Sequence, residues 1–329
     1  MATFVRTQEV EHEIGQAGTF VLEVTSGEVE LRAVDGHTAH VRARFELRAA
    51  SDADADELFE RVRLHARQAD GLLELTEPRN SLGAGTLARI LRFGSDVGEL
   101  RIEADLPRGA EVRIAVVSAE LTATGFSGQQ QYRTVSGDLV LTDAGGEVRV
   151  KAVSGDISIR AERLIGLDIG SVSGDLSAVA PRFSQVRANT VSGDIEIEGE
   201  LGAGDDHRVE TVSGDLSLGL VGGLALEVRG LSTDVDCRLP HRSEGSRDRR
   251  RYIIGDGRSA MAFSSMSGDV SIQAARRVRS GEAPPEVPAA PGPKTPPAPA
   301  APEQLEILRA LERGELSVDE AARRLSDER

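Results

Sequence analysis

The sequence has one cysteine, no tryptophan and two tyrosines in 329 residues. The single cysteine, Cys237, excludes an intrachain disulfide and every zinc site built from four cysteines. No Cys-His pattern surrounds it, so we interpret it as a small strand residue. Aromatic residues make up only 3% of the chain. This scarcity disfavours lectins and single-strand nucleic-acid binders, which usually stack their ligands on aromatic rings.

Long apolar runs and an excess of positive charge are also missing. No run reaches the roughly 18 apolar residues that span a bilayer, and residues 1–7 lack the apolar core of a signal peptide. We therefore expect a cytoplasmic protein with no transmembrane segment, and peripheral association with the envelope stays open. The net charge of −15 argues against nucleic acid as a partner.

A short motif, Val-Ser-Gly-Asp followed by Leu or Ile, recurs through the middle of the chain. The serines of its first five copies are separated by 18, 19, 19 and 21 residues, and a period of this kind indicates a repeat architecture. Each Ser-Gly-Asp is predicted to form a structural turn. The six copies comprise Ser136, Gly137, Asp138, Ser154, Gly155, Asp156, Ser173, Gly174, Asp175, Ser192, Gly193, Asp194, Ser213, Gly214, Asp215, Ser267, Gly268 and Asp269.

The motif predicts an all-β protein whose central part is a β-solenoid, with two short strands in each coil of about 19 residues. Glycine allows the backbone of a tight corner, and Ser and Asp can bond the corner's free N–H groups. The flanking aliphatic residues are expected to point to one side and to stack on their counterparts in neighbouring coils. The alternative is an antiparallel meander or sandwich with Ser-Gly at its hairpin turns. Hairpins give no reason for a fixed period, so the solenoid is favoured.

The rest of the chain divides by composition. Residues 1–110 are predicted to form an irregular β-rich cap, with a short helix over 51–61 and a hairpin turn at Asp70-Gly71. Residues 111–280 form the repeat. Ser267 follows Ser232 by 35 residues, so a turn between them is expanded or doubled, with the excess over the arginine-rich residues 241–251. Residues 281–302 hold nine of the thirteen prolines and form a linker, and residues 303–329 form a small αα-hairpin.

Two stretches are candidate partner contacts, because they differ from the repeat. The arginine-rich stretch is either a solvated loop or a contact for an acidic partner such as a phosphate, a lipid headgroup or a protein. The helical hairpin is too small to be stable alone and should dock on the solenoid, another copy or a partner. The residues concerned are Arg247, Arg249, Arg250, Arg251, Leu305, Leu308, Leu311, Val318 and Leu325.

No pattern in the sequence predicts catalysis, a metal or a cofactor. The repeated aspartates would stack about 4.8 Å apart, where adjacent carboxylates repel by roughly 1 kcal/mol in water. Turn N–H groups or a row of Ca²⁺ ions could offset this repulsion. We favour the N–H groups, because calcium-binding β-rolls use shorter repeats that are denser in Gly and Asp. The histidines show no metal-ligand spacing, and no nucleophile or nucleotide motif occurs. A β-helix carbohydrate-active enzyme is the remaining catalytic alternative.

The repeated motif, together with residues 254–257 and 265–272, resembles a bacterial β-strand-repeat family catalogued as putative adhesins of unknown function. Residues 307–322 resemble a short helical module of LiaX-type envelope-stress proteins. The resemblance implies a non-enzymatic scaffold or interaction protein in bacterial envelope maintenance or stress response. Because the helical hairpin should dock on something, we also expect a protein partner or self-association. A self-assembling cytoplasmic scaffold is the alternative, since stacked coils leave pairing edges unless they are capped.

Overall fold

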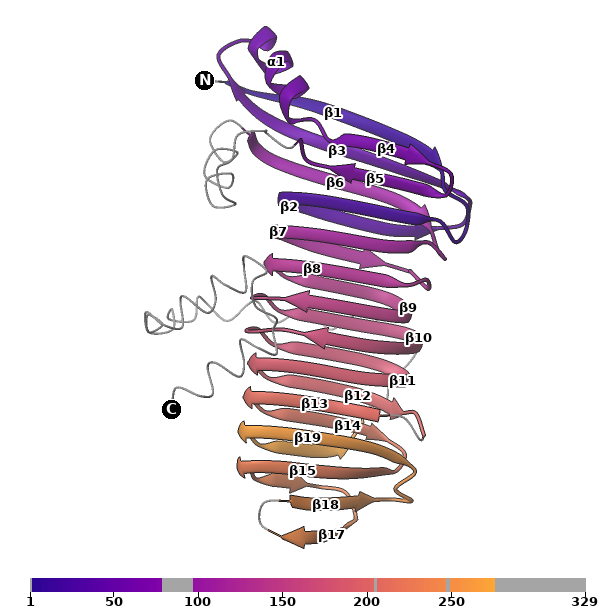
Figure 1. Cartoon of the computed structure of the whole chain (residues 1–329), viewed down its shortest axis with the longest axis vertical. Coiled ribbons are helices and arrows are strands. Elements are labelled where there is room, and N and C mark those ends of the chain that lie inside the picture. The colour runs from indigo at the N-terminus through magenta and orange to yellow at the C-terminus, as the bar shows by residue number, and fades with distance from the viewer. Residues whose placement is uncertain (1, 79–96, 204–205, 247–248, 276–329) are drawn as a thin grey trace.

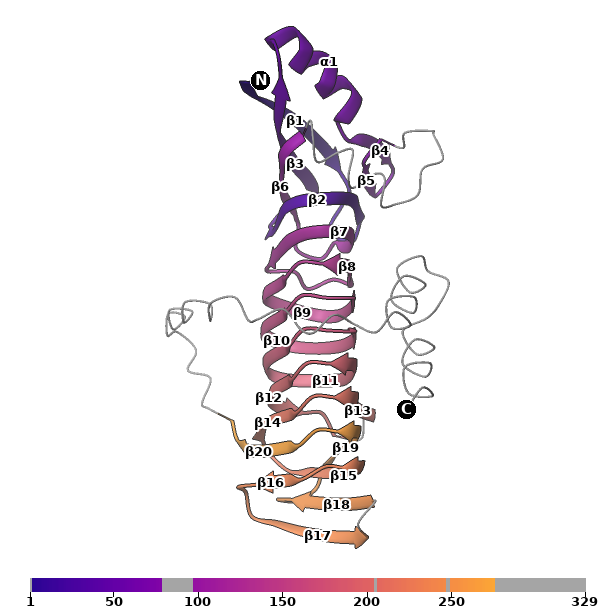
Figure 2. The same ribbon diagram turned by 90° about the vertical axis from the view of Figure 1, so that its left-hand side faces the viewer.

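The computed structural model is a long β-solenoid in which two sheets face each other across one core (Figures 1 and 2). It describes residues 2–78, 97–203, 206–246 and 249–275. In chain order the elements are β1 (Ala2–Glu13), β2 (Thr19–Val34), β3 (Thr38–Ala49), α1 (Asp52–Val62), β4 (His65–Ala69), β5 (Leu72–Thr76), β6 (Val97–Pro107), β7 (Glu111–Thr124), β8 (Gln130–Ser136), β9 (Leu139–Ala152), β10 (Ile157–Gly170), β11 (Leu176–Ser192), β12 (Ile195–Leu201), β13 (Asp206–Ser213), β14 (Leu216–Val221), β15 (Leu224–Ser232), β16 (Val235–Cys237), β17 (His241–Ser246), β18 (Arg249–Ile254), β19 (Ser259–Ser267) and β20 (Val270–Ala274).

Each coil contributes one strand segment to each of two sheets. Segments that lead into a Ser-Gly-Asp corner form sheet I, and segments that leave the corner form sheet II. Sheet I runs β4, β5, the first halves of β2 and β7, β8, the second halves of β9, β10 and β11, then β13, β19, β15, β18 and β17. Sheet II runs β1, β3, β6, the second halves of β2 and β7, the first halves of β9, β10 and β11, then β12, β14, β20 and β16.

Successive coils pair in parallel along the whole middle of the molecule. Ile157 of β10, for example, lies between Leu139 of β9 and Leu176 of β11. This parallel stacking confirms the predicted β-solenoid and excludes the antiparallel sandwich. Antiparallel pairing is confined to the two ends, where β1, β3 and β4 lie at one end and β17 and β18 lie at the other.

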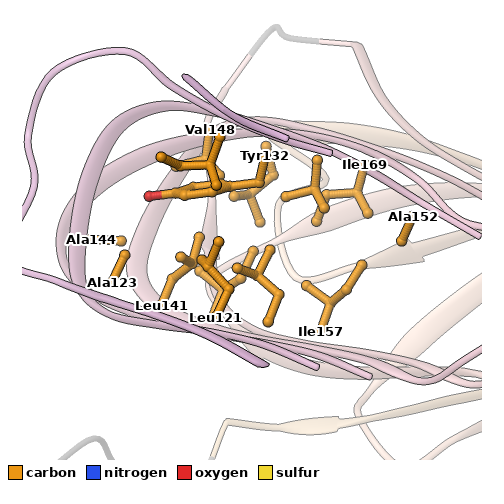
Figure 3. Packing of buried hydrophobic residues seen from close by; sticks show 14 of the residues in the cluster. Leu121, Ala123, Tyr132, Leu141, Ala144, Val148, Ala152, Ile157 and Ile169 are labelled. Carbon is orange, nitrogen blue, oxygen red and sulfur yellow. The ribbon is translucent and has the colours of Figure 1, made fainter. Parts of the chain in front are cut away.

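The core is continuous from Ile14 to Ile272. In Figure 3, Leu121, Leu141 and Ile157 of sheet II face Tyr132 and Ile169 of sheet I across a dry interior. Fully burying a side chain of this size contributes roughly 1.5–3 kcal/mol. Every coil adds several of them, so the rod is stabilised locally by each coil against its neighbours.

One expectation about the motif needs correction. The aliphatic residue after each aspartate is buried, but the residue before the serine is at least partly exposed on the outer side of sheet I in five of the six copies, Val172 at 8% exposure being the exception. Ala152 is buried and Val153, the next residue, is half exposed. The reason is strand alternation: the residue before the valine points inward, so the valine must point outward. The two aliphatic positions therefore do not share one column.

The glycine of the motif is required for two reasons. Gly155 and Gly174 have φ values of 114° and 117°, a region that side chains with a Cβ rarely adopt. In addition, a Cβ at Gly174 would collide with the carbonyl oxygen of Gly155, because the corners of successive coils stack closely. Corner geometry and coil spacing thus depend on the same residue.

The N-terminal region follows its local sequence. Helix α1 begins at the N-cap Ser51, whose side chain accepts from the backbone N–H of Asp54, as the pattern over residues 51–61 predicts. β4 and β5 form the predicted hairpin around Gly71, which has a φ of 68°. β2 pairs with β7 in both sheets, so the solenoid starts with β2, within the region predicted as a cap.

The C-terminal end contains a coil that is out of sequence order. The last described coil, β19 and β20, lies between the coil of β13 and β14 and the coil of β15 and β16. The excess predicted between Ser232 and Ser267 is the antiparallel hairpin β17–β18, which closes sheet I (Figure 1). The predicted linker, the helical hairpin and its residues Leu305, Leu308, Leu311, Val318 and Leu325 lie outside the described residues.

Candidate functional site: the corner ridge and the outer face of sheet I

The aspartates of the corners form one continuous hydrogen-bonded ladder. The backbone N–H of Asp156 donates to Oδ1 of Asp138 at 2.9 Å, and that of Asp175 donates to Oδ1 of Asp156 at 2.9 Å. The same bond links each later pair at 2.8–3.0 Å, in the order Asp175, Asp194, Asp215, Asp269 and Asp234. The ladder follows the spatial order of the coils, so it includes the inserted coil.

The ladder uses one oxygen of each carboxylate to satisfy the next corner. The aspartate side chains are otherwise exposed, and no three His, Cys, Asp or Glu side chains gather as a metal site within the described ranges. Among the serines, Ser154 donates through Oγ to the carbonyl oxygen of Val135 at 3.2 Å. These contacts are internal to the corners and assemble no nucleophile beside a base.

We expect replacement of one aspartate to separate its hydrogen bond from its charge. Asp175→Ala should lower the free energy of unfolding by about 1 kcal/mol, because the N–H of Asp194 loses its partner. Asp175→Asn should be nearly neutral, because an amide oxygen can still accept that bond. Chemical denaturation measures both. Glu196→Ala, an exposed carboxylate of sheet II with no such bond, is the matched control. A loss in Asp175→Asn equal to that in Asp175→Ala would contradict the hydrogen-bond role.

The outer face of sheet I carries a set of cations along the rod. Alternation exposes them: Val148 and Val150 point into the core, whereas Arg149 and Lys151 point to solvent. The cations at such outward positions are Arg113, Arg133, Arg149, Lys151, Arg187, Arg208, Arg229, Arg249 and Arg251. Most carboxylates among them are held in ion pairs, such as Asp168 with Arg149 at 3.0 Å, whereas Glu23, Glu147 and Glu244 are exposed and form none within the described ranges.

The arginine-rich stretch is a strand, and its three described arginines have different surroundings. Arg249 and Arg229 both bind Glu227, at 2.8 and 2.6 Å, and hold the pKa of that carboxyl below its ordinary value. Arg250 points inward and donates to the backbone carbonyl oxygen of Thr233. Of these three arginines, only Arg251 is exposed and forms no ion pair within the described residues. Arg247 lies outside the described residues.

Four further cations of sheet I are, like Arg251, exposed and without an ion pair in the described part of the chain. They are Arg133, Lys151 and Arg187, together with Arg242 of the hairpin. Arg133 and Lys151 are in-register neighbours on adjacent coils. The sequence does not reveal Arg133, Lys151 and Arg187 as a group, because each is isolated along the chain and none belongs to a run of arginines. The signal that could have found them is their common place in the repeat.

A small polar pocket of about 160 Å³ opens on sheet I, lined by Glu111, Gln129, Gln130, Gln131, Glu147, Val148, Arg149 and Asp168. Its carboxylates do not converge as an acid and base would. Glu111 is held by Arg113 at 2.7 Å and Asp168 by Arg149 at 3.0 Å. The side-chain amide of the buried Gln130 donates to the carbonyl oxygen of Gly145 at 2.9 Å. The pocket is therefore a polar surface patch in which Glu111 and Asp168 are held in ion pairs.

Comparison with known proteins finds one matching family model and several similar solved structures. The family model described as Toastrack DUF4097 matches residues 6–197. A putative adhesin from Bacteroides fragilis NCTC 9343 is similar at 9% identity and a TM-score of 0.46, covering 82% of this chain and 97% of that one. A putative lipid binding protein from Parabacteroides distasonis ATCC 8503 is similar at 11% identity and a TM-score of 0.40, covering 82% and 96%.

A putative cell adhesion protein from Clostridium sporogenes ATCC 15579 is similar at 12% identity and a TM-score of 0.27, covering 82% of this chain and 99% of that one. No curated protein matches the sequence. Within the residues that the structure describes, no helix is both long and apolar enough to cross a membrane.

Proposed function

Because this chain belongs to the Toastrack DUF4097 family, we propose that it is a non-enzymatic scaffold of the bacterial envelope that binds an anionic surface through the outer face of sheet I. The observation that carries this proposal is the unequal charge of the two outer faces. Within the described ranges sheet I exposes five cations without an ion pair, whereas sheet II exposes fewer such cations, Arg48 and Arg160 among them, and more unpaired carboxylates, such as Glu120 and Glu196. The corner ridge adds the aspartate ladder.

The shape of the molecule favours contact over a surface. The side chains between the sheets form one continuous apolar core, and the rod presents long flat faces to solvent (Figure 2). A chain with a net charge of −15 would approach an anionic partner with only one side, so the binding face is selected by electrostatics. No particular observation favours a carbohydrate-active enzyme.

The cations near the end of the rod are the best targets for a test. Arg251 and Arg242 lie in adjacent strands, on the outer side of the hairpin, with no ion pair within the described part. Their counterparts on sheet II are Arg48 and Arg160, which are exposed and form no ion pair within the same ranges. Both pairs of substitutions change the net charge equally, so they separate the face from the total charge.

We expect the chain to sediment with vesicles that contain anionic phospholipid and to stay in solution with neutral vesicles. Each cation near an anionic surface contributes about 1 kcal/mol, so Arg242→Ser with Arg251→Ser should weaken binding about 30-fold. The matched control, Arg48→Ser with Arg160→Ser, should bind as the parent chain does. Equal losses in the two double variants, or no preference for anionic vesicles, would refute the proposed surface.

A further inference from the structure

The first strand is a long, regular edge of the molecule. β1 pairs with β3 from Ala2↔Ala49 to Glu13↔Thr38 without a register shift. No other strand of the described chain pairs with β1, which lies at one end of the rod (Figure 1). Twelve residues of unbroken pairing make a rigid edge, and the far side of β1 is a template for another strand.

The backbone groups on this open edge can be identified. The N–H of Ile14 donates to the carbonyl oxygen of His37 at 2.9 Å, so even-numbered residues bond to β3. Hydrogen-bonded and free residues alternate in an antiparallel pair, so the odd-numbered residues turn their N–H and C=O groups outward. Among these, the carbonyl oxygen of Val5 accepts from the Arg6 side chain at 3.1 Å and that of Glu11 from the Gln68 side chain at 3.4 Å.

The edge lacks several of the features that usually prevent strand pairing, although β1 carries the charged residues Arg6, Glu9, Glu11 and Glu13 and α1 lies beside it at the same end of the rod (Figures 1 and 2). Residues 2–13 contain no proline, glycine or lysine, and the strand has no bulge. Helix α1 is attached through side chains on the inner side of β1: Arg6 contacts Asp52 and Asp56, both at 2.7 Å. The opposite end of the rod differs. There the edge of sheet II is β16, which has only three residues, and Gly245 in β17 has a φ of 119°.

We propose that β1 is a dimerisation strand that pairs antiparallel with β1 of a second copy, around a two-fold axis at Thr7. In this register Phe4 lies opposite Val10 of the other copy and Val5 lies opposite Glu9. Arg6 lies opposite Gln8, and no two like charges are opposite each other. The odd-numbered residues meet as hydrogen-bonded pairs, which matches the outward direction of their backbone groups, and the side chains of Arg6 and Gln68 must leave the carbonyl oxygens of Val5 and Glu11 for these bonds to form.

Neighbouring registers are less complementary. Moving the axis to Arg6 puts the two arginines of the symmetric copies opposite each other and places Phe4 against Gln8. Moving it to Glu9 opposes two glutamates. Moving it to Gln8 keeps charges apart but places Phe4 against His12 and Arg6 against Val10. The axis at Thr7 is the register that joins the apolar pair while avoiding repulsion.

Pairing through β1 gives a closed dimer, whereas end-to-end stacking of rods would continue without limit. A two-fold contact uses the same strand in both copies, so it is complete after two chains. The axis is normal to sheet II, and it therefore leaves the sheet I faces of both copies on the same side of a rod of double length. Such a dimer would present two basic faces together, which raises the avidity for an extended anionic surface. The dimer itself does not depend on the proposed function.

The test is the molar mass of the full chain measured by light scattering after size exclusion. We expect twice the chain mass of 35.0 kDa. Val5→Glu places a glutamate opposite Glu9 at two symmetric positions and should give the single-chain mass. Adding Glu9→Arg turns each clash into an ion pair and should restore the double mass, although residue 9 then loses its ion pair with Arg42 of the same chain. Val140→Glu is the matched control, because Val140 is an outward valine within sheet II and its change should leave the dimer intact.

Val5 is 43% exposed, so its replacement should not unfold the chain, and circular dichroism verifies this. A single-chain mass for the parent protein at concentrations up to the near-millimolar range would overturn the proposal. So would a Val5→Glu variant that stays dimeric or a double variant that stays monomeric. Vesicle binding measured on the Val5→Glu monomer separates the two proposals, because a monomer can still bind with the lower affinity of one face.

Discussion

Gly174→Ala should lower the free energy of unfolding by about 3 kcal/mol or more, although it adds one methyl group. The backbone at Gly174 has a φ of 117°, where a residue with a Cβ is strained by about 1–3 kcal/mol. In addition, the new Cβ would meet the carbonyl oxygen and carbon of Gly155. Backbone atoms of a neighbouring coil cannot move aside as a flexible side chain can, so the two coils must separate.

Gly36 is a control that separates the contact with the neighbouring coil from the backbone strain. Gly36 has a φ of 143° but no atom within 4 Å of its hypothetical Cβ, so Gly36→Ala should show only the conformational strain. Denaturation gives the difference in stability, and hydrogen–deuterium exchange locates it. Exchange should accelerate in the coils that flank Gly174 and stay unchanged in β1 and β3. Equal losses in the two variants would mean that coil contact contributes nothing at this corner.

The corner at Gly174 also shows why the solenoid could be predicted from the sequence. A residue type that is needed once per coil leaves a period in the sequence, and the solenoid follows from that period. α1 and the hairpin at Gly71 were predictable for the same reason, because Ser51 and Asp70-Gly71 act on their immediate neighbours. Local chemistry also suggested the turn role of Asp. It did not show that each carboxylate bonds the N–H of the next coil, because that contact joins residues 18–54 positions apart.

Features that depend on the order of coils in space could not be predicted. The motif at Ser267 has the same Ser-Gly-Asp as the motifs of the other coils, so a coil that carries it can stack on β13 as well as the next coil in sequence can. No local pattern therefore shows that β19 is inserted between β13 and β15. For the same reason, the sequence predicts only a loop or a partner contact for the arginine-rich stretch. Only the pairing of β18 with β15 reveals that Arg250 points inward while Arg251 points outward. The outward cations Arg133 and Lys151 likewise form a pair only after stacking.

The inserted coil leads to the second large expectation. A chain that ends at Gly257 lacks only the last described coil in sequence, which in a regular solenoid would be a terminal unit that is lost at little cost. Here β19 pairs with β13 on one side and with β15 on the other. We therefore expect residues 224–254 to lose their attachment to the rod. Limited proteolysis should cut them rapidly, and their amide exchange should approach that of an unfolded chain.

The size of the effect follows from what the coil buries. Met261, Phe263, Val270 and Ile272 are all at most 2% exposed, and burial of each contributes roughly 1.5–3 kcal/mol. A chain that ends at Ala275 is the control, because it keeps the inserted coil and should retain full protection of β15 and β18. Protection in the shorter chain equal to that in the control would mean that β15 had restacked directly on β13. The repeated corners would then be interchangeable, and the order of coils would be set by chain connectivity rather than by the fit of β19 between its neighbours.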